Sequence, residues 1–261
     1  MSTDAREEWQ DWRERRRAAI SGPYGPLALA GTHWLADHPD GRIAGLPGHW
    51  TAGDDAVVLR AGPDDGLTVD NEPAAGEIRL GPDADPASTR VTSGERHLLV
   101  LRRDGDWAVR DFDPESKARR SFAGIDVYGH DERWVRPGLF RPYAQGRTIR
   151  VRNADGQRRG LGLAGELAFT LEGDEHTLQV AVEGDGSLWA VLADATSGTD
   201  SYRFRFLRPP APAADGTVTV DLNRILLPPC AFADHFLCPF PPPGNTLSVA
   251  LRAGERNPTV R

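Results

Sequence analysis

The stretch LAFTLEGDEHTLQVAVEGDGSLWAVL, residues 167–192, decides the fold class of this chain. Apolar side chains fall on alternate positions in three consecutive runs, at Leu167, Phe169 and Leu171, then Leu178, Val180 and Val182, then Leu188, Ala190 and Leu192. Successive side chains of a strand point to opposite faces of a sheet, so this period predicts three strands with one buried face. Turn-forming residues at 173–174 and 184–186 separate the runs and predict antiparallel connections.

Short extended runs also precede this stretch, at residues 56–60, 67–69, 76–80, 97–103 and 107–112. Asp104-Gly105 joins the last two and is a typical type I′ hairpin turn. Further strands are expected at 134–143, 148–152, 202–206, 218–222 and 247–251. The predicted fold is therefore mainly β, with antiparallel sheets in a sandwich or barrel-like arrangement.

The N-terminus predicts one amphipathic helix, because Trp9, Trp12, Arg16 and Ile20 recur at helical spacing before the stop at 21–23. Its arginines are interleaved with acidic residues, which favours a solvated, ion-paired face over an anion or nucleic-acid patch.

The stretch DLNRILLPPCAFADHFLCPFPPPGN, residues 221–245 and here called the proline-rich segment, holds six prolines, both cysteines and His235. Proline lacks a backbone donor and fixes φ, so this segment is expected to lie as an irregular ribbon against the β body. The expected organisation is a helix over 1–22, an antiparallel β region over 23–145 and a second one over 146–261 closed by this segment. A single domain is the open alternative.

Composition limits the partners and the compartment. The net charge of −7 argues against nucleic acid, because phosphate binding requires clustered cations. No apolar run approaches the roughly 20 residues of a membrane span, and the N-terminus lacks a secretory apolar core. We therefore expect a soluble cytoplasmic protein with reduced cysteines and without a membrane partner. The sequence does not indicate its oligomeric state.

The candidate ligand-binding residues are donors suited to a small-molecule anion: Arg119, Arg120, Tyr202 and Arg205, with His33 as a further candidate. A second set is expected to hold the backbone of the proline-rich segment, namely Asp194, Thr196, Asp221, Asn223 and Asn245. No motif implies a cofactor.

Cys230, His235 and Cys238 offer ligand types that zinc accepts, but the paired knuckles and fourth ligand of structural zinc sites are missing. No motif of a cysteine nucleophile surrounds either thiol. Buried free thiols or a local disulfide are the favoured interpretations, and both stay open.

Several motifs resemble an uncharacterised bacterial family, domain of unknown function 1684. They are Asp221-x-Asn223, Pro228-Pro229-Cys230-Ala231-Phe232, Cys238-Pro239-x-Pro241-Pro242, Asn245, Ala253-Gly254-Glu255 and, upstream, Trp34-Leu35, Phe122-x-Gly124 and Asp194-x-Thr196-x-Gly198. The resemblance extends over nearly the whole chain. It implies no activity, substrate or catalytic residue.

The leading hypothesis is a pocket for a small anionic molecule, used for binding or catalysis, with no reaction indicated. One alternative is a structural or protein-interaction role without catalysis, in which the proline-rich segment and the tryptophans, especially Trp9 and Trp12, form an interface. The second is a zinc-binding protein that uses Cys230, His235 and Cys238.

Overall fold

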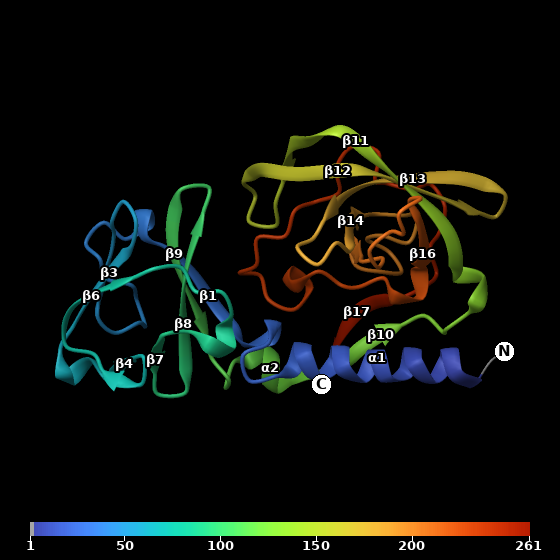
Figure 1. Cartoon of the computed structure of the whole chain (residues 1–261). Coiled ribbons are helices and arrows are strands. Elements are labelled where there is room, and N and C mark those ends of the chain that lie inside the picture. Colours follow the sequence, from blue (N-terminus) through green and yellow to red (C-terminus); the bar gives the residue numbers. More distant parts are fainter. Residues whose placement is uncertain (1–2) are drawn as a thin grey trace. The chain divides into compact units, whose positions relative to one another are not determined.

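The computed structural model describes residues 3–261, and the chain forms two compact units. The terminal unit comprises the residues up to 17 together with 123–261, and the inserted unit comprises residues 18–122. Both units consist mainly of antiparallel strands, and one long helix, α1 (Thr3–Ser21), begins the chain (Figure 1). The predicted mainly β fold class is confirmed. No helix within residues 3–261 has the length and apolar character that crossing a membrane requires.

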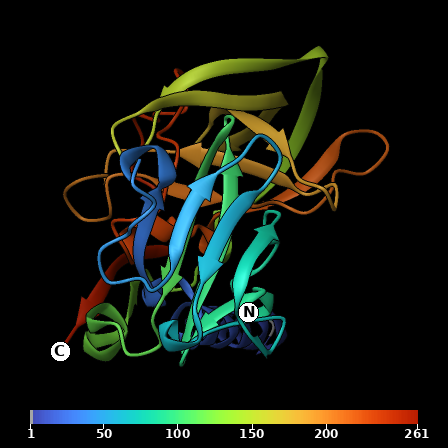
Figure 2. The same cartoon turned by 90° about the vertical axis from the view of Figure 1, so that its left-hand side faces the viewer.

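The inserted unit contains two antiparallel sheets, whose strands run from blue to green in Figure 2. The sheet orders are β1-β9-β8-β7-β4-β5 and β2-β3-β6. The strand bounds are β1 Leu29–Trp34, β2 His49–Ala52, β3 Val57–Ala61, β4 Leu67–Val69, β5 Glu72–Pro73, β6 Gly76–Leu80, β7 Val91–Ser93, β8 Arg96–Arg103 and β9 Asp106–Phe112. Trp50, Leu59 and Leu98 are fully buried in the core of this unit. A short helix, α2 (Lys117–Ser121), ends it.

The hairpin between β8 and β9 follows directly from its turn residues. Asp104 has φ +54° and Gly105 φ +97°, so both adopt the left-handed conformation that a type I′ turn requires. Arg103 pairs with Asp106 across the turn, as predicted for a two-residue loop.

The terminal unit is built on a six-stranded sheet with the order β15-β14-β13-β12-β11-β16. Its strands are β11 Val135–Arg152, β12 Arg158–Leu171, β13 Asp174–Val182, β14 Leu188–Leu192, β15 Arg205–Leu207 and β16 Thr217–Asp221. The three alternating runs of residues 167–192 form the end of β12, β13 and β14, and Leu167, Leu178 and Leu188 have no exposed surface. In Figure 1, β11, β12 and β13 curve over the C-terminal part of the chain.

Three strand predictions need correction. Residues 134–143 and 148–152 belong to one strand, β11, whose pairing with β12 shifts register between Pro142 and Arg147. Of the expected strand at 202–206, only Arg205 and Phe206 are paired; they belong to β15, which ends at Leu207. Residues 247–251 are not a strand, because the amide of Leu251 donates to the Asp194 carboxylate instead of to a ladder. The last strand is β17 (Glu255–Val260), which pairs with β10 (Phe122–Val127).

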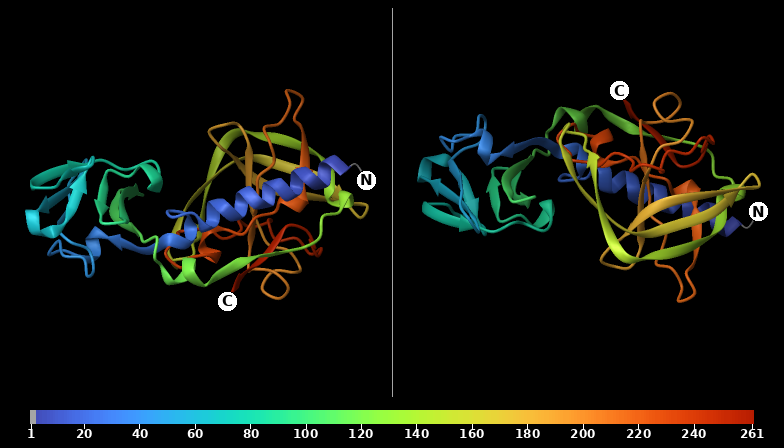
Figure 3. Two further views of the ribbon diagram at one scale, coloured as in Figure 1. Left: turned by 90° about the horizontal axis from the view of Figure 1, so that it is seen from below. Right: turned by 90° about the horizontal axis from the view of Figure 1, so that it is seen from above.

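The proline-rich segment is irregular and packed, as predicted. It contains only two 3-10 turns, Leu222–Arg224 and Pro229–Ala231, and its apolar side chains Leu227, Phe232 and Leu237 are buried. Seen from below in Figure 3, α1 lies across the terminal unit. Hydrogen bonds attach the helix to the segment: Trp9 Nε1 donates to the Asn223 carbonyl at 3.1 Å, and Arg16 Nη2 donates to the Leu227 carbonyl at 2.8 Å.

Arg205 of β15 connects the end of β14, through a buried ion pair, to the chain that follows the proline-rich segment, through hydrogen bonds. Arg205 Nη2 lies 2.7 Å from Asp194 Oδ2, and neither side chain has exposed surface. The same guanidinium donates to the carbonyls of Leu251, Ala253 and Glu255 at 2.8, 2.7 and 3.0 Å. Arg205, one of the candidate ligand-binding residues, is therefore fully buried and bound by protein groups. Three carbonyls and one carboxylate replace the water that its charge would otherwise need.

Replacement of Asp194 by Asn should destabilise the protein strongly, because it leaves the buried guanidinium without a counter-charge. Removing one partner of a buried pair costs about 3–5 kcal/mol. Urea denaturation followed by circular dichroism measures this loss. The control is Glu183→Gln, which removes the partner of Arg208 in a partly exposed pair and should change the free energy of unfolding by less than about 1 kcal/mol. Equal effects of the two substitutions would contradict the assigned role.

Gly254 lies where the chain passes against Ile225 of the proline-rich segment. Its φ is +75°, and a Cβ atom there would lie 2.5 Å from the Ile225 carbonyl oxygen and 2.7 Å from Ile225 Cβ. Gly198 has nearly the same φ, +79°, but a Cβ atom there would meet nothing within 4 Å. Substitutions at the two glycines therefore distinguish two effects: backbone strain acts at both positions, and steric overlap acts only at Gly254.

Gly198→Ala should cost only the left-handed backbone penalty, about 1–2 kcal/mol. Gly254→Ala should lower the free energy of unfolding by clearly more, because the proline-rich segment at Ile225 must also move to make room for the new Cβ atom. Thermal unfolding of both variants tests this difference. If the melting temperature of Gly254→Ala equals or exceeds that of Gly198→Ala, the close approach to Ile225 does not add to the loss of stability.

Candidate functional site

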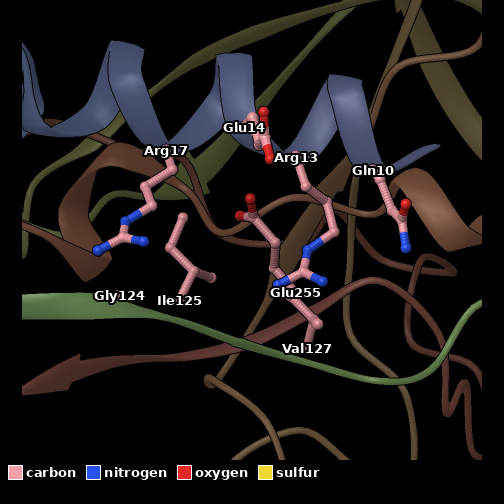
Figure 4. A pocket seen from close by; sticks show the side chains of 8 residues that line it. All are labelled: Gln10, Arg13, Glu14, Arg17, Gly124, Ile125, Val127 and Glu255. Carbon is pink, nitrogen blue, oxygen red and sulfur yellow. The ribbon is translucent and has the colours of Figure 1, made fainter. Parts of the chain in front are cut away.

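A recess of about 490 Å³ lies between α1 and the β10–β17 pair of the terminal unit, here called the α1 recess. Its lining residues are Gln10, Arg13, Glu14, Arg17, Gly124, Ile125, Val127 and Glu255. In Figure 4, Arg13 and Arg17 extend from the helix toward β10, with Ile125 and Glu255 between them. The volume is in the range of small-molecule sites, about 300–1,000 Å³.

Glu255 forms the inner wall of the recess and is only 2% exposed. Its Oε1 accepts from Arg16 Nε at 3.1 Å, and its Oε2 accepts from the backbone amide of Leu227 at 2.6 Å. Arg16 is 20% exposed and pairs outside its helix with Glu255, so it does not belong to the solvated face expected of the helix arginines, whereas Arg15 and Arg17 are exposed. Because both oxygens have donors, the charge of Glu255 is compensated inside the protein.

Arg13 and Arg17 supply the positive charge of the recess. They are four residues apart on α1 and therefore project from the same side of the helix. The guanidinium of Arg13 lies 4.8 Å from the centre of the Trp9 ring, and Arg17 Nη2 donates to the Ala123 carbonyl at 3.1 Å. Stacking on Trp9 fixes the plane of the Arg13 guanidinium while leaving its edge able to donate hydrogen bonds.

A second recess, of about 540 Å³, lies in the inserted unit between β9 and the loops around residues 36 and 54. Its single arginine, Arg102, stacks 5.0 Å over the ring of Trp107, and Asp54 and Asp106 also line it. This lining is acidic on balance and suits an anion less well than the α1 recess.

Three of the ligand-binding residues predicted from the sequence belong to the inserted unit. Arg119 donates to the carbonyls of Ser21 and Pro114 at 2.9 and 2.7 Å, so its guanidinium links two backbone segments. Arg120 is exposed and lies 3.9 Å from Glu115. His33 lies on β1, and its ring faces that of His38 at 6.1 Å.

The other two, Tyr202 and Arg205, belong to the terminal unit. Tyr202 donates to the Cys230 carbonyl at 3.0 Å, and burial raises the pKa of its phenol. Arg205 is the buried partner of Asp194 described above. The five predicted residues are thus divided between the two units: His33, Arg119 and Arg120 lie in the inserted unit, and Tyr202 and Arg205 lie in the terminal unit.

The polar residues expected to hold the proline-rich segment bind backbone groups around it. Asn245 donates to the carbonyls of Gln179 and Val191, both at 2.9 Å, and accepts from the Gln179 amide. Asn223 exchanges hydrogen bonds with the backbone of residue 131, and its amide donates to Asp221. Thr196 donates to Asp194 at 2.7 Å, and Asp194 also accepts from the amide of Leu251.

Both cysteines are free thiols buried in the terminal unit. The backbone amide of Cys230 lies 3.3 Å from Cys238 Sγ. Within residues 3–261, no three or more His, Cys, Asp or Glu side chains are grouped so that they could hold a metal ion, and Cys230, His235 and Cys238 form no such set.

The residues of the α1 recess were not among the predicted ligand-binding residues. Two signals pointed to them: the arginine cluster of residues 13–17, interpreted as a surface face, and Glu255, noted only as part of the family motif Ala253-Gly254-Glu255. Nothing in the local sequence relates positions separated by about 240 residues, so the pairing of Arg16 with Glu255 becomes visible only in three dimensions.

The motifs that surround Glu255 and the proline-rich segment also decide the family. Residues 120–256, more than half of the chain, match the family described as "Protein of unknown function (DUF1684)". The chain belongs to this family. The match covers β10 to the start of β17, which is nearly all of the terminal unit that follows α1. The predicted family membership is confirmed.

Among solved structures, the chain is similar to the solution NMR structure of an uncharacterized protein from gene locus rrnAC0354 of Haloarcula marismortui. The two sequences are 27% identical, the TM-score is 0.43, and the similarity covers 52% of this chain and 77% of the other. No curated protein matches the chain.

Replacement of Arg16 by Gln should destabilise the protein by about 2–4 kcal/mol, because the buried Glu255 carboxylate loses its cation. The matched control is Arg15→Gln on the exposed neighbouring position, expected to change stability by no more than about 0.5 kcal/mol. Chemical denaturation measures both. If the two variants unfold at the same denaturant concentration, Arg16 does not stabilise the inner wall of the recess.

Proposed function

We propose that the terminal unit binds a small molecule carrying a carboxylate or phosphate group in the α1 recess. The observation that carries this proposal is the pair Arg13 and Arg17, which face a recess of ligand size whose buried carboxylate, Glu255, is already paired with Arg16. The sequence predicted an anionic ligand. The proposal keeps this class of ligand and assigns other residues to it.

The charge balance of the lining supports an anionic ligand. Glu255 is neutralised by Arg16 and by the amide of Leu227, so it adds little net negative charge to the recess. Glu14 is exposed, where water screens its charge. Arg13 and Arg17 therefore dominate the field at the entrance, and guanidinium groups bind planar carboxylates and phosphates through paired hydrogen bonds.

The other residues that line the recess indicate what the rest of the ligand is like. Ile125 and Val127 of β10 provide an apolar wall, and Gln10 provides an amide at one end. A compact molecule with an anionic end and a short apolar body fits these groups. The helix and strand that carry them are held together by the Arg16–Glu255 pair, so the recess is formed before a ligand arrives.

We place this binding function in the cytoplasm, as the sequence predicts. Both thiols, Cys230 and Cys238, are unbridged, which suits a reducing compartment.

Differential scanning fluorimetry with citrate, inorganic phosphate and benzoate tests the proposal. We expect at least one of these probes to raise the melting temperature of the wild-type protein, since a ligand that binds only the folded state stabilises it. Arg13→Gln and Arg17→Gln should each weaken binding about tenfold to hundredfold in calorimetric titration, as loss of a charged hydrogen bond predicts.

The control is Arg15→Gln, which lies on the same helix outside the recess and should bind like the wild type. Absence of any shift with all three probes would contradict the proposal. So would equal binding by the Arg13, Arg15 and Arg17 variants, because it would place the anion elsewhere.

A further inference from the structure

Cys230 and Cys238 occupy one buried cluster at the two ends of a nine-residue loop within the proline-rich segment. The cluster also contains Phe204 and Phe206, with Tyr202 and Phe240 packed against it. The Cys230 amide donates to Cys238 Sγ at 3.3 Å, and the Tyr202 hydroxyl lies 3.7 Å from Cys230 Sγ. The thiols thus share one polar environment inside an otherwise aromatic surrounding.

Hydrogen bonds to backbone carbonyls hold both ends of this loop. Tyr202 donates to the Cys230 carbonyl, and the Ala154 amide donates to the Cys238 carbonyl at 2.8 Å. Asn153 Nδ2 donates to the Leu237 carbonyl at 3.0 Å. Pro229 precedes Cys230 and Pro239 follows Cys238, so prolines and these hydrogen bonds restrict the backbone at both ends of the loop.

Polar and charged neighbours act on the Cys230 thiol. A hydrogen bond from the Cys238 thiol, together with smaller contributions from Tyr202 and Arg203, lowers the pKa of Cys230 to about 7 against the opposing effect of burial. The Arg203 guanidinium lies 4.8 Å from the Phe240 ring centre and 5.4 Å from that of Tyr202. Stacking on these rings keeps a cation beside Cys230.

We propose that Cys230 and Cys238 form a redox-active dithiol, a modification site at which a small peroxide converts the pair to an intramolecular disulfide. In the first step the Cys230 thiolate attacks one oxygen of hydrogen peroxide, the O–O bond breaks, and Cys230 becomes a sulfenic acid while hydroxide leaves. In the second, Cys238 sulfur attacks Cys230 sulfur, the S–O bond breaks, and water leaves with the proton of Cys238. Two thiols are oxidised and one peroxide is reduced to two waters.

Burial determines which oxidants can act. Cys230 is 4% and Cys238 6% exposed, so a molecule of the size of hydrogen peroxide reaches the sulfurs more easily than a protein disulfide does. Since the chain contains only these two cysteines, any disulfide within one chain must join them.

Intact mass spectrometry of the folded protein after treatment with hydrogen peroxide tests the proposal. The wild-type protein should lose the mass of two hydrogen atoms, become resistant to iodoacetamide and regain both thiols with dithiothreitol. In Cys238→Ser, oxidation should stop at a sulfenic acid on Cys230 that dimedone traps. Cys230→Ser should give less dimedone adduct than Cys238→Ser, because Tyr202 and Arg203 favour the thiolate of Cys230.

Three results would overturn the proposal: wild-type thiols that both remain alkylatable after peroxide treatment, a disulfide-linked dimer as the main product, or a Cys230→Ser adduct equal to that of Cys238→Ser. Circular dichroism spectra show whether each variant is folded. If a variant is not folded, the mass and alkylation state of the wild-type protein still decide between a disulfide and inert thiols. These outcomes do not depend on a ligand in the α1 recess.

Discussion

The Arg205 guanidinium is the group on which the architecture of the terminal unit depends. The chain after the proline-rich segment, residues 247–254, has no strand of its own, so its carbonyls need donors from elsewhere. Arg205 donates to two of them, Leu251 and Ala253, and also to the carbonyl of Glu255, while Asp194 balances its charge and accepts from the Leu251 amide. Hydrogen bonds from one buried guanidinium thus take the place of strand pairing. They join β15, at the edge of the sheet, to the irregular chain of residues 247–254.

Glu255 extends this arrangement to the N-terminus. Its carbonyl accepts from Arg205, and its carboxylate binds Arg16 and the Leu227 amide. Helix α1, the start of the proline-rich segment and β17 therefore meet at one residue. The α1 recess lies beside this junction. Glu255 therefore both stabilises the fold and forms a wall of the proposed binding site. The proposed dithiol of Cys230 and Cys238 lies in a different buried cluster, within the same proline-rich segment.

Local signals in the sequence predicted much of the fold and little of the candidate site. Asp104-Gly105 predicted its hairpin because a type I′ turn depends on the φ preferences of two adjacent residues. The runs of residues 167–192 predicted β12 to β14 because a half-buried strand must alternate. The expected strand at 247–251 was wrong, because Leu247 and Leu251 are buried in the hydrophobic core of the terminal unit without strand pairing.

The sequence by itself determined the mainly β class, the N-terminal helix, the irregular proline-rich segment and the family, since each follows from residue preferences within a short window. Only the tertiary structure decided that β10 pairs with β17, that Arg205 is buried, and that Arg13 and Arg17 face Glu255. These depend on contacts between residues far apart in the chain. Their energies come from desolvation and charge pairing, which no local pattern records.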